Sequence, residues 1–192
     1  MEMWFEEIPP LESQNYLLRG VEPVDGDSLF GFLKDKETMK YITPNPVQTL
    51  KEVVRSIEEQ LSRFKQHKEI PWVIEDKATG RVIGTFRFHK LHMWHRKTEM
   101  GVVISQAFQK KGVMTEILPV LLRFGFEVLH LNRIVGDIFA ENMGSTRLMT
   151  KFGFQKEGQL RQTDFDGERF HDTIVYSLLK AEYEALKGYD LF

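Results

Sequence analysis

The sequence of 192 residues contains no cysteine. This absence excludes disulfide bonds, zinc sites built from thiolates, and catalysis by a cysteine nucleophile. It is typical of proteins in a reducing compartment, so we expect a cytoplasmic location. Any catalytic chemistry must use other side chains.

Neither sign of charge is in large excess, because 26 Lys and Arg residues face 28 Asp and Glu residues and the net charge is -2. Such a chain has no global positive field with which to hold a nucleic-acid backbone. The sequence also lacks a run of about 18 apolar residues, and the acidic start MEMWFEEIPP lacks the basic and apolar regions of a signal peptide. We therefore expect no direct contact with nucleic acid and no membrane span.

No internal repeat, low-complexity tract or Gly/Ser/Pro-rich linker divides the chain. A chain of this length buries roughly 70% of the surface that its unfolded form exposes. We therefore predict one domain over residues 1–192, built around one core.

Apolar periodicity predicts the order of the elements. One amphipathic helix carries Leu29, Phe30, Leu33 and Met39, and a second begins at Thr49, whose spacing to Glu52 is that of a capping box. The second helix has Leu50, Val54, Ile57, Leu61 and Phe64 on one face. A third carries the stripe Val113, Ile117, Val120, Leu121, Phe124 and Val128, with a kink expected at Pro119. Strands are predicted at 15–21, 71–76, 81–91, 98–105, 133–140, 155–162 and 171–179, with a hairpin turn at 164–167.

This order predicts an α+β fold with a mostly antiparallel sheet of about seven strands flanked by helices. The strands at 98–105 and 133–140 are joined through a helix. The stretch FQKKGVMTEIL at 108–118 forms the mouth of that helix. Its first amides have no intrahelical partner and carry the positive end of the helix dipole, so they suit a phosphate. Taken alone, Lys-Lys-Gly is more simply interpreted as an ordinary solvated turn.

The combined pattern resembles the GNAT family of N-acetyltransferases. The resemblance rests on the loop QKKGVM, on Asn142 and Ser145, and on KFGF at 151–154. The segments EMGVVI, NRIVGDIFAENMGSTRLMTKFGFQKEGQL and HDTIVYSLL resemble the branch that acetylates the N-terminal alanine or serine of ribosomal proteins. Similarity is good over about 81–179. Lys110 departs from the glycine that relatives often have, and Met114 from glycine or alanine.

The resemblance implies acetyl-CoA as cosubstrate and no metal. It implies a sheet splayed between the strands at 98–105 and 133–140, where backbone pairs with the pantetheine arm. The cofactor-binding residues implied are Val102, Val103, Ile104, Gln109, Lys110, Lys111, Gly112, Val113, Met114, Thr115, Asn142 and Ser145.

The resemblance also implies direct attack of a neutral amine on the thioester. Ser145 is then the donor to the departing thiolate, although it would equally satisfy backbone near a helix start. Asp164 matches the carboxylate that serves as general base in the ribosomal branch, with an aspartate where glutamate is expected. The competing interpretation is that Asp164 opens a turn. Glu99 is the second candidate base.

The expected acceptor site includes the loop residues Tyr41, Thr43 and Asn45. His92 and Trp94 are candidates for the same pocket, although surface decoration is an equally simple interpretation. His89, His92 and His95 have a spacing that suggests a metal face only on a helix, and this stretch is typical of a strand end and a turn.

The expected partner is an acceptor amine, first of all a protein N-terminus, with the enzyme a monomer or homodimer. Two alternatives stay open. The acceptor is a small amine such as a polyamine or an amino sugar, or the protein is a CoA-binding sensor without turnover.

Overall fold

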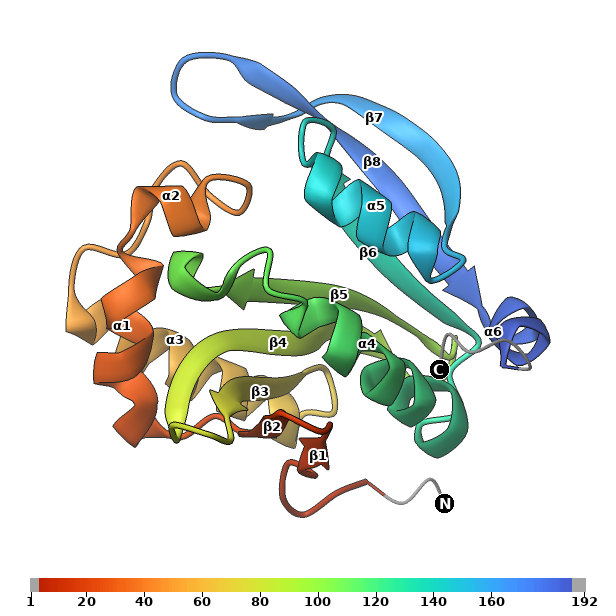
Figure 1. The fold of residues 1–192 in the computed structure, drawn as a ribbon, viewed down its shortest axis with the longest axis horizontal. Coiled ribbons are helices and arrows are strands. Elements are labelled where there is room, and N and C mark those ends of the chain that lie inside the picture. The colour runs from red at the N-terminus through yellow and green to blue at the C-terminus, as the bar shows by residue number, and fades with distance from the viewer. Residues whose placement is uncertain (1–3, 188–192) are drawn as a thin grey trace.

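The computed structural model describes residues 4–187, which form an eight-stranded sheet with the order β1-β2-β3-β4-β5-β6-β8-β7 (Figure 1). Every neighbouring pair is antiparallel except β5 and β6, which are parallel. The strands are β1 (Leu11–Glu12), β2 (Tyr16–Gly20), β3 (Ile70–Asp76), β4 (Arg81–His92), β5 (Lys97–Ile104), β6 (Arg133–Phe139), β7 (Gln155–Phe165) and β8 (Phe170–Leu179). The predicted α+β architecture is confirmed. The additional strand, β1, is too short to carry a periodic signal.

Helices cover both faces of this sheet (Figure 1). One face packs against α4 (Val113–Arg123) and α5 (Met143–Lys151), and the other against α1 (Gly26–Leu33) and α3 (Leu50–Lys65). The remaining helical segments are η1 (Pro23–Asp25), α2 (Lys36–Met39), η2 (Gln106–Phe108), the π-helical η3 (Phe124–Val128) and α6 (Lys180–Leu186). Within residues 4–187, no helix has the length and apolar character needed to cross a membrane.

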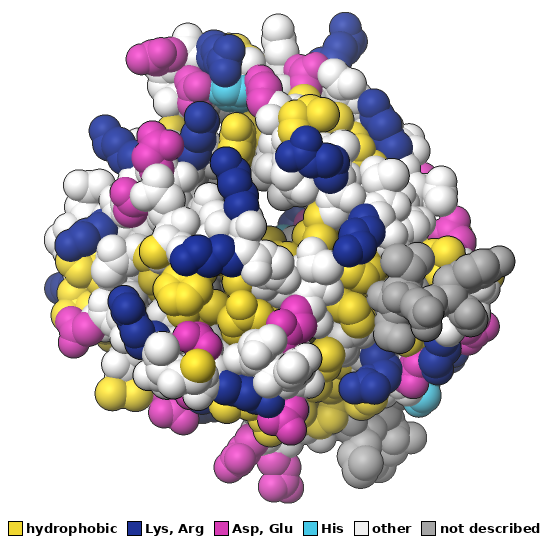
Figure 2. Space-filling model, in the orientation of Figure 1, with side chains coloured by type: hydrophobic (Ala, Val, Ile, Leu, Met, Phe, Trp, Pro, Cys, Tyr) yellow, Lys and Arg dark blue, Asp and Glu magenta, His cyan; other side chains and the backbone are white. Residues whose placement is uncertain are grey.

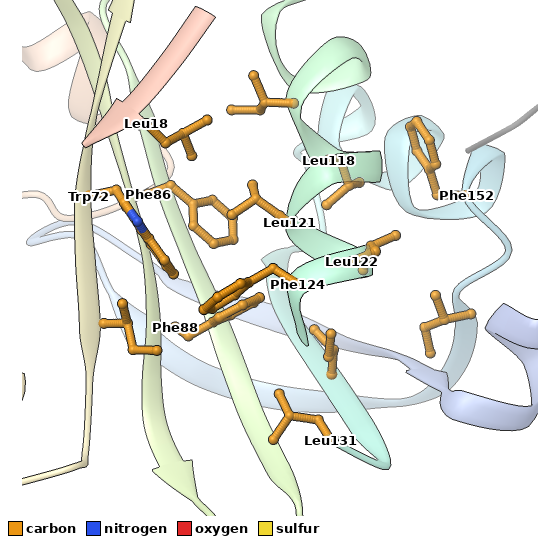
Figure 3. Close-up of a cluster of buried hydrophobic side chains, with 14 of the residues drawn as sticks. Leu18, Trp72, Phe86, Phe88, Leu118, Leu121, Leu122, Phe124, Leu131 and Phe152 are labelled. Atoms are coloured by element: carbon orange, nitrogen blue, oxygen red, sulfur yellow. The ribbon is translucent and has the colours of Figure 1, made fainter. Parts of the chain in front are cut away.

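The larger core lies between the sheet and α4 (Figure 3). Trp72, on β3, meets Phe124 edge to face, with ring centroids 5.7 Å apart and planes at 87°. Leu118 and Leu121 of α4 are fully buried and point toward the sheet. Because interiors are close-packed, these contacts hold α4 in one position. The N-terminus of α4 is therefore fixed relative to β5.

The N-terminal helical region differs from the prediction in two ways. The helix predicted to run from Leu29 to Met39 is divided, because Asp35 caps a separate α2 by accepting the Thr38 amide at 2.7 Å. In α3 the capping role of Thr49 is confirmed, with the Glu52 amide donating at 3.3 Å. However, Val53 lies on the buried face of α3, while Leu50 is exposed.

The third helix lies where it was predicted, but not every residue of its predicted apolar face is buried. Residues Val113, Ile117, Leu121 and Phe124 are buried as predicted, whereas Val128 is exposed. The helix continues through Pro119 and widens into a π-helical turn after Arg123, where the Leu129 amide donates to the Phe124 carbonyl at 3.0 Å. This wider turn rotates Val128 out of the apolar stripe.

The sheet opens between β5 and β6. These two strands pair at only three positions, Lys97 with Arg133, Thr98 with Ile134 and Glu99 with Val135. Beyond them, β5 pairs only with β4 and β6 only with β8. Figure 1 shows the two strands diverging from that point. The predicted splay is therefore confirmed, and it starts directly after Glu99.

Candidate active site

The loop between β5 and α4 presents backbone amides at the open end of the sheet. Gly112 is the N-cap of α4 and has a φ of +84°, in the left-handed region that glycine adopts without strain. The Glu116 amide donates to the Gly112 carbonyl at 3.0 Å. The amides of Val113, Met114 and Thr115 therefore belong to the first turn, where no intrahelical acceptor is available. This geometry suits an anion.

The neighbouring side chains have different roles. Lys110 adopts a φ of +59°, which explains why glycine is also suited to this position. Lys110 and Lys111 are exposed, and the Lys111 Nζ lies 5.3 Å from the centre of the Phe108 ring. Gln109 instead folds back, its Nε2 donating to the Ile104 carbonyl at 2.9 Å. Gln109 thus shapes the loop, while the lysines remain available to an anion. Figure 2 shows this face hollowed near its middle, with Lys and Arg side chains around the hollow.

The inner edge of β5 offers backbone groups to the gap. The Ser105 amide donates to Ile83 at 2.8 Å, so alternate residues from Ser105 backward direct their backbone toward β4. The intervening residues Met100, Val102 and Ile104 therefore face the gap. Val103, predicted to take part, faces β4 with its backbone and packs its side chain near α1 and α3. Met100 takes its place in the edge that is open to a ligand.

The start of α5 lies on the β6 side of the gap. Asn142 caps this helix, because its Oδ1 accepts the Ser145 amide at 3.1 Å. The half-buried Ser145 hydroxyl has no hydrogen-bond partner within residues 4–187. Asn142, and not the Ser145 hydroxyl, therefore satisfies the backbone at the start of α5. The serine hydroxyl and the Asn142 Nδ2 donors remain available to a ligand.

Three carboxylates share the sheet face opposite α4. Glu99 forms an ion pair with Lys90 at 2.7 Å. Asp164 accepts a hydrogen bond from the Thr173 hydroxyl at 2.8 Å. Asp137, on β6, has a raised pKa because of partial desolvation, with the charges of Glu99 and Asp164 adding to the effect. The three side chains are therefore electrostatically coupled beside the gap.

The turn prediction for Asp164 is wrong. Strand β7 continues to Phe165 because Asp164 pairs with His171 across the hairpin, after a bulge at which Gln162 has a φ of +54°. The actual turn follows, with Gly167 at a φ of +100° and Asp166 accepting the amides of Glu168 and Arg169, both at 2.8 Å.

A pocket with a volume of about 200 Å³ opens beside the end of β6. Its walls come from the loop after α2, from the end of β6 and from the β7–β8 hairpin. Tyr41 lies in one wall, with its ring 6.5 Å from that of Phe139. The lining residues are Lys40, Tyr41, Pro44, Phe139, Glu141, Phe165, Asp166, Arg169 and His171.

Not every predicted acceptor residue reaches this pocket. Thr43 and Asn45 contact each other in the same loop, where the Asn45 amide donates to the Thr43 hydroxyl at 3.2 Å, but Tyr41 and Pro44 form the wall. His92 ends β4, and Trp94 lies in the β4–β5 connection. Both precede the paired start of β5, while the gap opens toward the far end of that strand. Trp94 is 87% exposed there. The fold therefore separates these two residues from the pocket.

The stretch that carries His89, His92 and His95 forms a strand end and a turn, as predicted. β4 ends at His92, whose Nδ1 accepts the His95 amide at 3.2 Å in the following turn. In the described part of the chain, no group of three or more His, Cys, Asp or Glu side chains is arranged to hold a metal ion.

Sequence reasoning missed Asp137 and His171. Asp137 is the single acidic residue of the strand RIVGDIF, in which every other residue after Arg133 is apolar, and this is a usable signal. His171 is 8% exposed, and its ring lies between two carboxylates. No local pattern indicates this arrangement, because one carboxylate comes from a segment 30 residues away.

Comparison with known proteins identifies the family. The model of the acetyltransferase (GNAT) domain matches residues 15–155. The uncharacterized N-acetyltransferase YoaA of Bacillus subtilis (strain 168) is 32% identical over 173 residues, covering 90% of this chain and 98% of that protein.

Solved structures share the fold. RimL, a ribosomal L7/L12 α-N-protein acetyltransferase in complex with coenzyme A, has a TM-score of 0.83 at 17% identity, with 89% of this chain and 98% of that one covered. Spermidine N-acetyltransferase from Vibrio cholerae, in complex with CoA and spermine, has a TM-score of 0.79 at 24% identity, with 88% and 98% covered. On the family match and the full-length relative, this chain belongs to the GNAT family of N-acetyltransferases.

Proposed function

We propose that the protein transfers the acetyl group of acetyl-CoA to the N-terminal α-amine of a protein. The observation that carries this proposal is the gap between β5 and β6, which opens beyond Glu99 and Val135. The amides at the start of α4 lie at the open end of β5, and the aromatic pocket lies at the end of β6. This arrangement supports a donor site at the start of α4 and an acceptor site in the pocket.

The residues present fit acetyl-CoA. The amides of Val113, Met114 and Thr115 suit its diphosphate, with Lys110 and Lys111 adding positive charge. Val102 and Ile104 offer backbone groups to an extended pantetheine arm, as an exposed sheet edge does for an added strand. The Val102 amide is also a suitable donor to the thioester oxygen as charge develops on it.

The chemistry requires a neutral amine and a protonated leaving group. The amine nitrogen bonds to the carbonyl carbon, the carbon–sulfur bond breaks, and the sulfur leaves with the electron pair. We assign Ser145, whose hydroxyl is not used in capping α5, as the hydrogen-bond donor to that sulfur. Asp164, Asp137 and Glu99 are the candidates to receive the amine proton, directly or through water.

The pocket favours a peptide over a polycation. Its walls include Tyr41, Phe139 and Phe165, which suit the side chains of the first residues of a peptide. Its carboxylates, Glu141 and Asp166, are already engaged by His171. Positive charge on His171 and Arg169 therefore offsets their negative charge and weakens their attraction for further ammonium groups.

The coupled carboxylates Glu99, Asp137 and Asp164 favour a second candidate, a polyamine acceptor. A polycation needs convergent negative charge, and these three side chains provide it on one face of the sheet. The spermidine acetyltransferase among the structural neighbours supports the same candidate.

Separate reactions with each acceptor distinguish the two candidates. The protein is incubated with acetyl-CoA and either peptides with a free N-terminal serine or alanine, or spermidine, and free thiol is measured. Because the chain contains no cysteine, all thiol detected comes from CoA. We expect thiol release with the peptides and none with peptides whose N-terminus is already acetylated. Release with spermidine alone would support the second candidate, and no release with any amine would contradict acetyl transfer.

Removing the proposed base should have a limited and pH-dependent effect. A terminal α-amine has a pKa of about 7.7 to 8.0, so roughly a tenth is neutral at pH 7 without help. We expect Asp164→Asn to lower kcat/KM about tenfold at pH 7. The deficit should shrink above pH 8, where the amine deprotonates unaided. Glu99→Gln and Asp137→Asn serve as matched comparisons, and a larger loss in either would move the base to that residue.

A further inference from the structure

His171 joins two separate walls of the pocket. Its Nδ1 lies 3.1 Å from a carboxylate oxygen of Glu141, and its Nε2 lies 2.5 Å from one of Asp166. Glu141 directly precedes Asn142, the cap of α5, and Asp166 organises the turn of the β7–β8 hairpin. The imidazole therefore bridges the hairpin and the segment that leads into Ser145.

The bridge needs a proton. A carboxylate only accepts hydrogen bonds, so each ring nitrogen must donate, and only the imidazolium has two N–H donors. The hydrogen bond with Asp166, and then that with Glu141, raise the pKa of His171 above its usual range. The same contacts help to lower the pKa of Glu141 and of Asp166.

Other charged groups around the ring are few. Asp164 is its register partner on β7, and Lys40 contributes to the same pocket from the loop after α2. Arg169 lies 4.0 Å from Glu141 and 3.9 Å from Asp166 but is 69% exposed, so solvent screens these contacts. The Phe139 ring covers the imidazole edge-on at 5.5 Å. The two carboxylates thus dominate its surroundings.

We propose that His171 is a positioning residue that, when protonated, clamps the β7–β8 hairpin against the α5 entry and so shapes the acceptor pocket. This proposal rests on the proposed function for its kinetic consequence, but not for the clamp itself. A folded-state pKa raised above 6.5 means that the clamp is complete below about pH 6.5. It is lost as the pH rises through the raised pKa, when one of the two hydrogen bonds disappears.

The kinetic test compares the wild type with His171→Gln, using a peptide with a free N-terminal serine. We expect the variant to raise the peptide KM about tenfold at pH 6, and the ratio of the two KM values to fall toward one at pH 9. Ionisation of the peptide amine cancels in this ratio. The KM for acetyl-CoA should not change. His92→Gln, in the β4–β5 connection, is the matched control and should behave as the wild type.

A second measurement does not require turnover or a folded variant. In the wild type, NMR titration of the His171 ring should give a pKa above 6.5, and hydrogen-exchange protection of the Glu168 and Arg169 amides should fall as the ring deprotonates. An unshifted pKa, or protection independent of pH, would overturn the clamp, as would a KM ratio that is constant with pH. If these measurements show the clamp but the protein acetylates no peptide, the result counts against the proposed function and not against the clamp.

Discussion

Gly112→Asp should weaken acetyl-CoA binding about a hundredfold relative to Gly112→Asn, which corresponds to about 2.7 kcal/mol. Both substitutions strain the backbone at this positive φ, although both residue types tolerate it better than most. Space does not distinguish them, because a Cβ at Gly112 would meet no atom within 4 Å apart from its chain neighbours. Only aspartate adds a negative charge beside the amides proposed to hold the diphosphate. Repulsion between charges about 4 Å apart is worth roughly 1 kcal/mol in water and 4 kcal/mol near a protein surface.

Isothermal titration calorimetry at low ionic strength measures this difference, which should diminish as salt is added. Thermal unfolding provides the control for folding, because a carboxylate at a helix N-terminus favours the helix dipole and should not destabilise α4. Equal affinities for the aspartate and asparagine variants would place the diphosphate away from the start of α4.

Ser145→Ala should reduce kcat about a hundredfold and leave the affinity for acetyl-CoA nearly unchanged. A positioned hydrogen-bond donor to a group on which negative charge develops contributes roughly 10² to 10³ in rate. The Ser145 amide, which Asn142 uses to cap α5, is retained in alanine, so the helix start should keep its geometry. The measurement is steady-state kinetics together with calorimetric titration of acetyl-CoA.

Thr150→Ala is the matched control for this substitution. Thr150 lies on the same helix, but its exposed hydroxyl donates to the Thr146 carbonyl at 3.0 Å and is remote from the cap. Its removal should leave kcat within about twofold. If Ser145→Ala and Thr150→Ala had the same kcat as the wild type, the serine hydroxyl would have no role in stabilising the leaving group.

Local patterns predicted most elements of the fold because their periodicity reflects one buried face. The alternation around Phe86 and Phe88 placed β4 correctly, and Thr49 marked the start of α3. Errors arose where a tertiary contact overrides the local pattern. Asp164 belongs to β7 because its partner His171 lies across the hairpin. Val128 leaves the apolar stripe because α4 widens into a π-helical turn.

The candidate site likewise has a part that local motifs predicted and a part that only tertiary contacts bring together. The loop around Gly112 and the pair Asn142 and Ser145 were predictable, since a resemblance in sequence marks contiguous motifs. The pairing of His171 with Glu141, and the coupling of Asp137 with Glu99, join segments that are distant in the chain. No local pattern marks such pairs.

By itself, the sequence determined the family, the order of most strands and helices, and the loop at Gly112 that we propose binds an anion, because each depends on neighbouring residues. The resemblance implied that β5 and β6 separate, but only the tertiary structure decided that they do so after Glu99 and Val135, and which side chains line the pocket. The physical reason is that strand separation and pocket shape depend on packing between distant segments. Trp72, Phe124 and Leu121 fix α4 against the sheet, and the position of α4 then sets where its amides meet the gap.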